Sequence, residues 1–208
     1  MIDMKKLISL LCALFLLLPC TFALADQGVT LYTPYGGTTI NTPGAYATLT
    51  NPEGVLYSGP GMNYTNIGAF DWNHTQMHCL SLAYDQYGET WVLVNYDDLY
   101  FPLYGYVRLT EFSYSDRQFL LSMLPYEYSY DQLNPEMLAM LYFSCDGRFG
   151  PGEHYYAPYY LDYRNTAGVI ILSSGDWALL ELEPATTRDM GLYTDKCRVW
   201  VELSNLMY

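Results

Sequence analysis

The chain has 208 residues, a net charge of −13 and 23 tyrosines. So negative a surface disfavours nucleic acid and anionic membranes as partners. Lys196 is the only lysine after residue 6, and a chain rich in Tyr and poor in Lys favours strands and aromatic contact surfaces over charged helices.

The first 25 residues have the layout of a secretory signal peptide. Lys5 and Lys6 form a positive segment, Leu7 to Leu18 is an apolar run, and Ala23-Leu24-Ala25 supplies small residues where a signal peptidase cuts. We expect cleavage before Asp26. The apolar run is shorter than the roughly 20 residues of a membrane span. The sequence therefore predicts a protein that is secreted or associated with the cell envelope, with no membrane span after cleavage.

A repeat follows an arm of residues 26–44, which is rich in Gly, Thr, Pro and Tyr and is predicted to be extended or to add a strand. The first landmark of the repeat is an aromatic residue, then Gly-Pro-Gly, two residues and Tyr, within Leu56–Tyr64 and again within Gly147–Tyr155. Pro fixes its own φ and Gly adopts angles closed to other residues, so both segments are predicted to be tight turns. The turn residues are Gly59, Pro60, Gly61, Gly150, Pro151 and Gly152.

Two further landmarks come in the same order in each copy. A Gly-bearing turn precedes a strand that Trp91 or Trp177 opens, and a short aromatic strand closes each copy at Gly105–Leu109 and Val199–Leu203. The spacings differ between the copies, which is expected where loops tolerate insertions.

The segment between the copies, 113–140, is predicted to be partly helical. Apolar residues recur at helical spacing in Asp116–Leu124, and Pro125 ends that pattern. Asn134-Pro135-Glu136 and the apolar residues up to Leu141 predict an N-capped second turn of helix. Both segments are too apolar for a flexible linker, so we expect them to pack between the copies.

The first copy resembles a bacterial SH3 (SH3b) domain. The matching residues are Ser58-Gly59-Pro60-Gly61, Trp91-Val92-Leu93-Val94 and Gly105-Tyr106-Val107. An arginine often precedes the Ser-Gly-Pro-Gly turn in that family, and we expect it to be missing from both copies, with Tyr57 in its place in the first. The second copy is more divergent, with Val199 where the family has glycine.

This resemblance implies a mainly β fold with two small SH3-like β-barrels in tandem. The expected ranges are a first domain at 45–112, the connector at 113–140 and a second domain at 141–208. The resemblance also implies that the ligand is cell-wall peptide or another envelope component.

Three cysteines remain after the expected cleavage: Cys79, Cys145 and Cys197. In an SH3-like barrel the first and last strands lie side by side, so we expect Cys145 and Cys197 to form a disulfide, which an exported compartment would preserve. Cys79 is then expected to be a small buried apolar residue in a strand.

Catalytic, metal-binding and cofactor-binding patterns are not expected. His78 adjoins Cys79, but neighbours on a strand point to opposite faces, and none of the three cysteines opens a helical pattern. His74 and His78 lie in strand and loop sequence, without a third ligand at metal-binding spacing. We therefore predict neither an enzyme nor a cofactor, and a cryptic cell-wall hydrolase that depends on Cys79 is the least favoured alternative.

The aromatic residues near the landmarks are the candidates for ligand binding: Tyr57, Tyr64, Trp91, Tyr106, Phe149, Tyr155, Trp177 and Trp200. They line a groove or fill the small cores; Trp91 and Trp177 favour the core, whereas Tyr57 and Tyr64 favour exposure near a turn. The leading hypothesis is a non-catalytic exported binding protein for cell-wall peptide or another envelope component, and the alternative is a scaffold that binds another exported protein.

Overall fold

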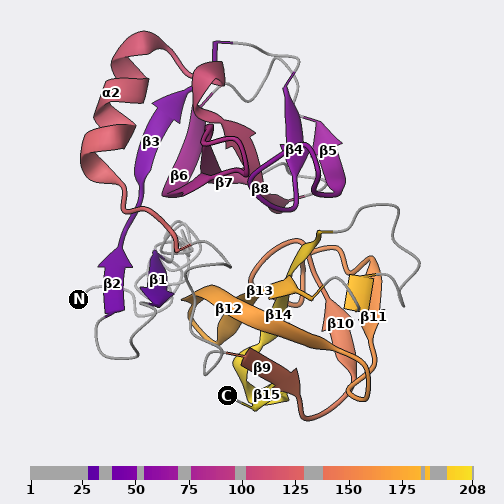
Figure 1. Ribbon diagram of the computed structural model, residues 1–208. Coiled ribbons are helices and arrows are strands. Elements are labelled where there is room, and N and C mark those ends of the chain that lie inside the picture. The colour runs from indigo at the N-terminus through magenta and orange to yellow at the C-terminus, as the bar shows by residue number, and fades with distance from the viewer. Residues whose placement is uncertain are drawn as a thin grey trace, which may run out of the picture.

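The computed structural model describes residues 28–32, 39–50, 54–69, 76–96, 102–128, 138–183, 186–187 and 196–207. It consists mainly of short antiparallel strands (Figure 1), so the predicted mainly β class is confirmed. The predicted signal peptide at 1–25 and His74 lie outside the described residues.

One six-stranded sheet forms the first unit, drawn in the upper half of Figure 1. Its strands are β3 (Ala45–Thr48), β4 (Val55–Tyr57), β5 (Asn66–Ala69), β6 (Gln76–Tyr84), β7 (Thr90–Tyr96) and β8 (Leu103–Arg108). They lie in the order β3-β6-β7-β8-β4-β5. A 3-10 turn, η1 (Leu109–Glu111), then brings Phe112 into a bridge with Leu49, directly after β3.

The second unit repeats this order. Its elements are β9 (Leu138–Leu141), β10 (Cys145–Gly147), β11 (Tyr159–Leu161), β12 (Ala167–Ser174), β13 (Trp177–Leu182), β14 (Arg198–Glu202), η4 (Leu203–Asn205) and β15 (Leu206–Met207). β9, β12, β13 and β14 are paired in succession, and a bridge between Arg148 and Trp200 places the β10–β11 hairpin beside β14. β15 pairs with β9, as Phe112 does with Leu49 in the first unit.

The strand register aligns the two units residue by residue. β6 and β12 each contain a bulge, at Leu80 and Ile171, because the pairing with the next strand shifts there. Tyr57 pairs with Tyr106 as Arg148 pairs with Trp200. Arg148 therefore occupies the position of Tyr57, and the expectation that both copies lack this arginine is wrong for the second.

Each Gly-Pro-Gly turn is covered by the tyrosine that follows it. The backbone N–H of Tyr64 donates to the Gly61 carbonyl, as that of Tyr155 donates to Gly152, both at 3.2 Å. A Cβ atom on Gly59 would lie 2.1 Å from the Tyr64 ring, and one on Gly150 would lie 2.2 Å from the Tyr155 ring. The first glycine of each turn is thus required because the ring lies directly on the backbone.

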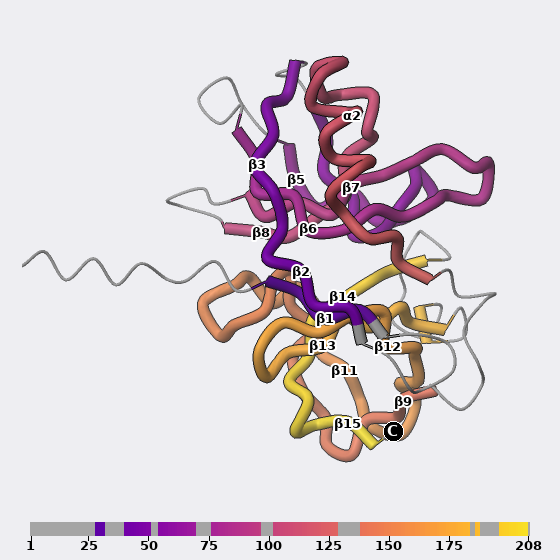
Figure 2. The backbone as a smooth tube through the Cα atoms, turned by 90° about the vertical axis from the view of Figure 1, so that its left-hand side faces the viewer, coloured from indigo at the N-terminus to yellow at the C-terminus, as the bar shows by residue number. Residues whose placement is uncertain are grey.

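The arm before the first unit belongs to the sheet of the second. β1 (Val29–Tyr32) and β2 (Thr39–Thr42) form a hairpin, and β1 pairs with the second half of β12. Figure 2 shows this hairpin against the second unit while β3, next along the chain, runs into the first. In the first unit, the strand equivalent to β12 is β6, and the segment around Tyr126 lies beside it through a bridge to Leu82. Each unit thus has an added segment along its β6 or β12 strand.

The connector contains one helix, α2 (Tyr114–Met123), as the pattern in Asp116–Leu124 predicts. The Ser113 hydroxyl caps it by accepting the Asp116 N–H, and Pro125 follows its last turn. The predicted second helical turn is wrong at its end, because Leu138–Leu141 is strand β9. Its four residues are all apolar and so carry no helical or strand period, and pairing with β12 and β15 decides the outcome.

The two units pack through the same face of their sheets. A hydrophobic cluster between them contains Leu93 and Tyr106 together with their counterparts Leu179 and Trp200. β7 and β13 are therefore buried on both faces, one face in the unit's own core and the other in the shared cluster. Two-sided burial explains their nearly continuous apolar sequences.

Candidate functional site

The structure places most of the predicted aromatic residues in the interior. Six have side chains that are almost completely buried: Tyr64, Trp91, Tyr106, Phe149, Tyr155 and Trp200. Tyr57 and Trp177 are partly exposed. The expectation that Tyr64 is exposed is wrong: it is 4% exposed because its ring packs on Gly59.

Several of these rings join the two units. Tyr104 contacts the rings of Tyr155 and Trp200 edge to face. Phe149, from the turn of the second unit, lies in the core of the first, and its carbonyl accepts the Tyr104 N–H. These aromatic side chains hold the units together, which is a different role from the groove lining considered from the sequence.

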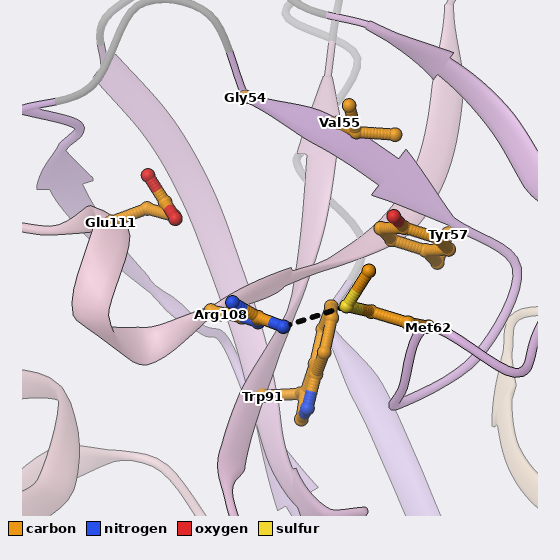
Figure 3. A pocket seen from close by; sticks show the side chains of 7 residues that line it. All are labelled: Gly54, Val55, Tyr57, Met62, Trp91, Arg108 and Glu111. Atoms are coloured by element: carbon orange, nitrogen blue, oxygen red, sulfur yellow. Dashed lines mark hydrogen bonds between the residues drawn. The ribbon is translucent and has the colours of Figure 1, made fainter.

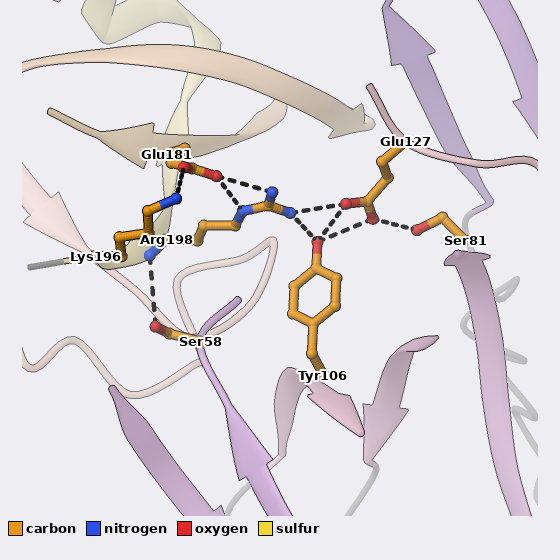
Figure 4. Close-up of polar contacts among 7 residues, drawn as sticks. All are labelled: Ser58, Ser81, Tyr106, Glu127, Glu181, Lys196 and Arg198. Atoms are coloured by element: carbon orange, nitrogen blue, oxygen red, sulfur yellow. Dashed lines mark hydrogen bonds and ion pairs between the residues drawn. The ribbon is translucent and has the colours of Figure 1, made fainter. Parts of the chain in front are cut away.

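A buried ionic network lies between the units and centres on Arg198, whose side chain is 2% exposed (Figure 4). Its guanidinium donates to Glu181 Oε2 at 2.8 Å, to Glu127 Oε2 at 2.7 Å and to the Tyr106 hydroxyl at 2.6 Å. Lys196 lies 3.8 Å from the other oxygen of Glu181. One buried cation therefore lies between two buried carboxylates, and Lys196, whose side chain is 39% exposed, adds a second positive charge at the edge of the network.

The same network ties the connector to both sheets. Glu127 accepts hydrogen bonds from the hydroxyls of Ser81 in β6 and Tyr106 in β8, while its backbone N–H donates to the Leu82 carbonyl. Burial raises the pKa of Tyr106 well above its ordinary value, so the phenol stays protonated. Burial alone would lower the pKa of Arg198, but Tyr106 and the carboxylates outweigh it and hold that pKa well above its ordinary value.

Sequence reasoning missed this network although the chain carries a signal for half of it. Glu181 stands between Leu180 and Leu182, and Arg198 between Cys197 and Val199. Charges in the middle of apolar strands are expected to be paired, and these two face each other across β13 and β14.

A surface groove lies on the first unit (Figure 3), lined by Gly54, Val55, Tyr57, Met62, Trp91, Arg108 and Glu111. Its volume is about 170 Å³. Trp91 forms the floor at 1% exposure, and the Tyr57 ring meets its ring edge to face at 5.5 Å. The Trp91 indole N–H donates to Asp85 at 3.3 Å, which fixes the ring from the other side.

Arg108 supplies the positive charge of the groove. Its guanidinium carbon lies 5.5 Å from the centre of the Trp91 ring, and one terminal nitrogen lies 2.8 Å from the Met62 sulfur. Its Nε lies 3.6 Å from the exposed carboxylate of Glu89. Glu111 adds an acidic group, which lies on the side of Arg108 away from Met62 in Figure 3.

The corresponding surface of the second unit has different chemistry. The register places Arg148, Trp177 and Glu202 where the first unit has Tyr57, Trp91 and Arg108. Arg148 donates to the carbonyls of Glu153 and Tyr155 and pairs with Asp146 at 3.1 Å. Its donors are thus engaged by the second unit itself.

Comparisons of this chain with protein-family models, curated proteins and solved structures found no match. The chemical character of the groove is therefore inferred from its own side chains. The groove combines an aromatic floor, a thioether, one cation and one acid within a space the size of a side chain. Ligand sites are likewise mostly apolar with a few placed polar groups, although they are usually larger than this groove.

The three cysteines of the described residues are free thiols, so the predicted disulfide between Cys145 and Cys197 is wrong. The strands that carry them are antiparallel, with Arg148 opposite Trp200. Cys145 stands three residues before Arg148, and Cys197 stands three residues before Trp200. Because the strands run in opposite directions, the two cysteines lie on opposite sides of this pair, about 20 Å apart along extended strands. A disulfide needs Cα atoms within roughly 7 Å.

The thiols of Cys79 and Cys197 are held protonated by burial. Burial raises the pKa of Cys79 far above its ordinary value and that of Cys197 to about 11. Nε2 of His78 lies 2.9 Å from the Pro43 carbonyl oxygen. Cys79 is fully buried in β6, as predicted.

Among the described residues, no group of three or more His, Cys, Asp and Glu side chains has a metal-binding arrangement. Within the same part of the chain, none of the helices combines the length and apolarity needed to cross a bilayer.

Proposed function

We propose that the protein is a non-catalytic binding protein of the cell envelope, built from two SH3-like units, and that the groove of the first unit holds its ligand. The ligand class is a peptide, either of the cell wall or of another envelope component. The groove carries this proposal, because an aromatic floor beside one cation and one acid suits a short peptide segment.

The SH3-like assignment is supported by the arrangement of strands. Each unit begins with a strand that pairs with the residues following a 3-10 turn, at Leu49 with Phe112 and at β9 with β15. First and last strands side by side are a feature of SH3-like barrels. The signal-peptide pattern of residues 1–25 supports the envelope location.

In this proposal the second unit stabilises the first unit and does not itself bind ligand. Its Arg148 is engaged by the carbonyls of Glu153 and Tyr155, and the shared cluster and Arg198 network fix the face through which the units pack. The second unit packs against Trp91 and Tyr57 and holds them in place, which lowers the entropy cost of ligand binding.

Sedimentation with purified cell-wall peptidoglycan at low salt tests this proposal. Wild-type protein is expected in the pellet. Met62→Glu is expected to remain in the supernatant, because it places a carboxylate against Arg108 and closes the groove. Met140→Glu makes the same exchange at another exposed methionine, in β9 of the second unit, and should sediment like wild type. Wild-type protein that stays in solution would refute the cell-wall ligand.

A second candidate function is a scaffold that binds another exported protein, and exposed aromatic side chains on the second unit favour it. Tyr142, Phe143, Tyr160 and Tyr163 are all exposed. The loops before β10 and after β11 are joined, because the Tyr163 N–H donates to the Ser144 hydroxyl. Such a patch is typical of protein contact surfaces.

The scaffold is tested by capture from an envelope fraction with immobilised protein. A double change, Tyr142→Ser with Tyr160→Ser, should abolish capture of a specific partner, whereas Met62→Glu should not. Loss with Met62→Glu alone would assign the partner to the groove instead.

A further inference from the structure

We infer that the groove of the first unit selects a ligand with a single carboxylate beside one apolar side chain, such as the free C-terminal end of a peptide. This inference rests on the proposed function and specifies the ligand of the same site. It starts from the hydrogen bonds that Arg108 makes and those that it leaves available.

The guanidinium of Arg108 has five N–H donors in a fork that matches a carboxylate. In the structure one terminal nitrogen is directed at the sulfur of Met62, which is a weak acceptor. The contact with Glu89 is long, at 3.6 Å, and involves Nε of a side chain that is 39% exposed. Among the described residues, the terminal nitrogens therefore lack a strong acceptor, and a carboxylate would provide one.

The orientation of the guanidinium is already fixed. It lies over the ring of Trp91, 5.5 Å from the ring centre, and Trp91 is itself held by Asp85. A stacked guanidinium loses less freedom when it binds a carboxylate than a mobile one would. Met62 is 64% exposed and can move aside when the anion replaces its sulfur.

The apolar part of the ligand follows from the size of the groove. A cavity of roughly 150 Å³ holds a benzene ring, so 170 Å³ accommodates one side chain against the partly exposed Tyr57 and Val55, above the buried Trp91. Glu111 lines the same groove and Glu89 lies next to Arg108. These two acids repel a ligand that carries several negative charges more strongly than one with a single carboxylate, which disfavours polyanions.

The second unit cannot make this recognition at the equivalent place. Glu202 stands where the first unit has Arg108, and the nearby Arg148 has its donors engaged by Glu153, Tyr155 and Asp146. The inference therefore predicts one ligand per chain.

The test uses two probes, the peptide N-acetyl-Ala-Ala-Leu with a free carboxylate and the same peptide as its carboxamide. Binding to the purified chain is followed by NMR through the indole N–H of Trp91. The free acid is expected to bind at least tenfold more tightly than the amide, with one site per chain. Arg108→Gln should remove that preference, Arg108→Lys should retain part of it, and Arg164→Gln, at an exposed arginine of the second unit, should leave it unchanged.

Equal affinity for acid and amide, no binding of the acid up to 10 mM, or an unchanged preference in a folded Arg108→Gln variant would each overturn the inference. Displacement of the acid by an equal concentration of tripolyphosphate would overturn the selection against polyanions. These outcomes are separate from the proposed function: sedimentation with peptidoglycan that Met62→Glu abolishes would still support a ligand in the groove when acid and amide bind equally.

Discussion

Replacing Arg198 by methionine tests the buried network that joins the two units. The variant keeps most of the side-chain volume but removes every hydrogen bond that the guanidinium makes to Glu181, Glu127 and Tyr106. The two carboxylates then remain in the interior, where their side chains are 4% and 1% exposed. Lys196, at 3.8 Å from Glu181, is the nearest remaining cation.

The expected loss of unfolding free energy is about 4 kcal/mol, because removing one partner of a buried ion pair typically costs 3–5 kcal/mol. For a chain of this size each kcal/mol lowers Tm by about 2–4 °C, so Tm should fall by roughly 8–16 °C. Urea and thermal unfolding at pH 7, followed by circular dichroism, measure both quantities.

Two further variants isolate the cause. Arg164→Met removes an exposed arginine that stacks on Tyr163 and should change stability by less than about 0.5 kcal/mol. The triple variant Arg198→Met, Glu127→Gln and Glu181→Gln should recover at least half of the loss, because neutral amides leave no buried charge. A cost below about 1 kcal/mol for Arg198→Met would refute the reasoning, and so would a triple variant less stable than the single one.

Three other predictions follow from local geometry and titration. Gly59→Ala should lower the unfolding free energy by about 3 kcal/mol, because its Cβ would lie 2.1 Å from the Tyr64 ring. The control Gly88→Ala, at a glycine with φ +82° and open space around it, should cost about 1 kcal/mol in urea unfolding. Equal costs for the two variants would contradict the packing argument. Burial raises the pKa of Cys145 to about 11, so its alkylation in the folded protein at pH 8 should be slow. Unfolding of the chain from Asp26 onward, without reductant, should yield three reactive thiols by mass spectrometry rather than the one that a disulfide would leave. Burial likewise raises the pKa of Tyr159 to about 12, whereas unfolded tyrosines lose their protons near pH 10. Its contribution to stability is therefore fully present below pH 10 and is lost as the pH rises toward 12, which should lower the urea midpoint at pH 10.5 relative to pH 8; an unchanged midpoint would argue against it.

The turns and strand starts of this fold can be predicted from sequence because their causes are local. Gly-Pro-Gly restricts its own backbone, and Trp91 and Trp177 follow glycines with positive φ, at Gly88 and Gly175. The helix at Tyr114–Met123 is equally local, with a serine cap at one end and a proline beyond the other.

The contacts between distant segments could not be predicted in the same way. The β1–β2 hairpin pairs with β12 although the whole first unit lies between them in the sequence. Glu127 likewise contacts Arg198, which is 71 residues further along the chain. The missing disulfide has the same origin: adjacency of two strands was expected, but the antiparallel register decides which residues meet.

The groove was only partly foreseen, for a similar reason. Tyr57 and Trp91 belong to the repeated landmarks, whereas Met62, Arg108 and Glu111 come from three separate elements. Arg108 and Glu111 are neighbours through η1, and the pairing of β4 with β8 brings the turn that carries Met62 to them. The prediction that Trp91 favours the core is confirmed, and the apolar run from Trp91 to Val94 is consistent with burial of β7 on both faces.

The most direct test of binding in the groove is the NMR spectrum of the Trp91 and Trp177 indole N–H groups during titration with soluble muropeptides from digested peptidoglycan. Trp91 lies in the groove, and Trp177 occupies the equivalent place in the second unit. A saturable shift of the Trp91 signal at one ligand per chain, with Trp177 unchanged, is the predicted result. No shift at Trp91, or an equal shift of both signals, would contradict a binding site in the first unit.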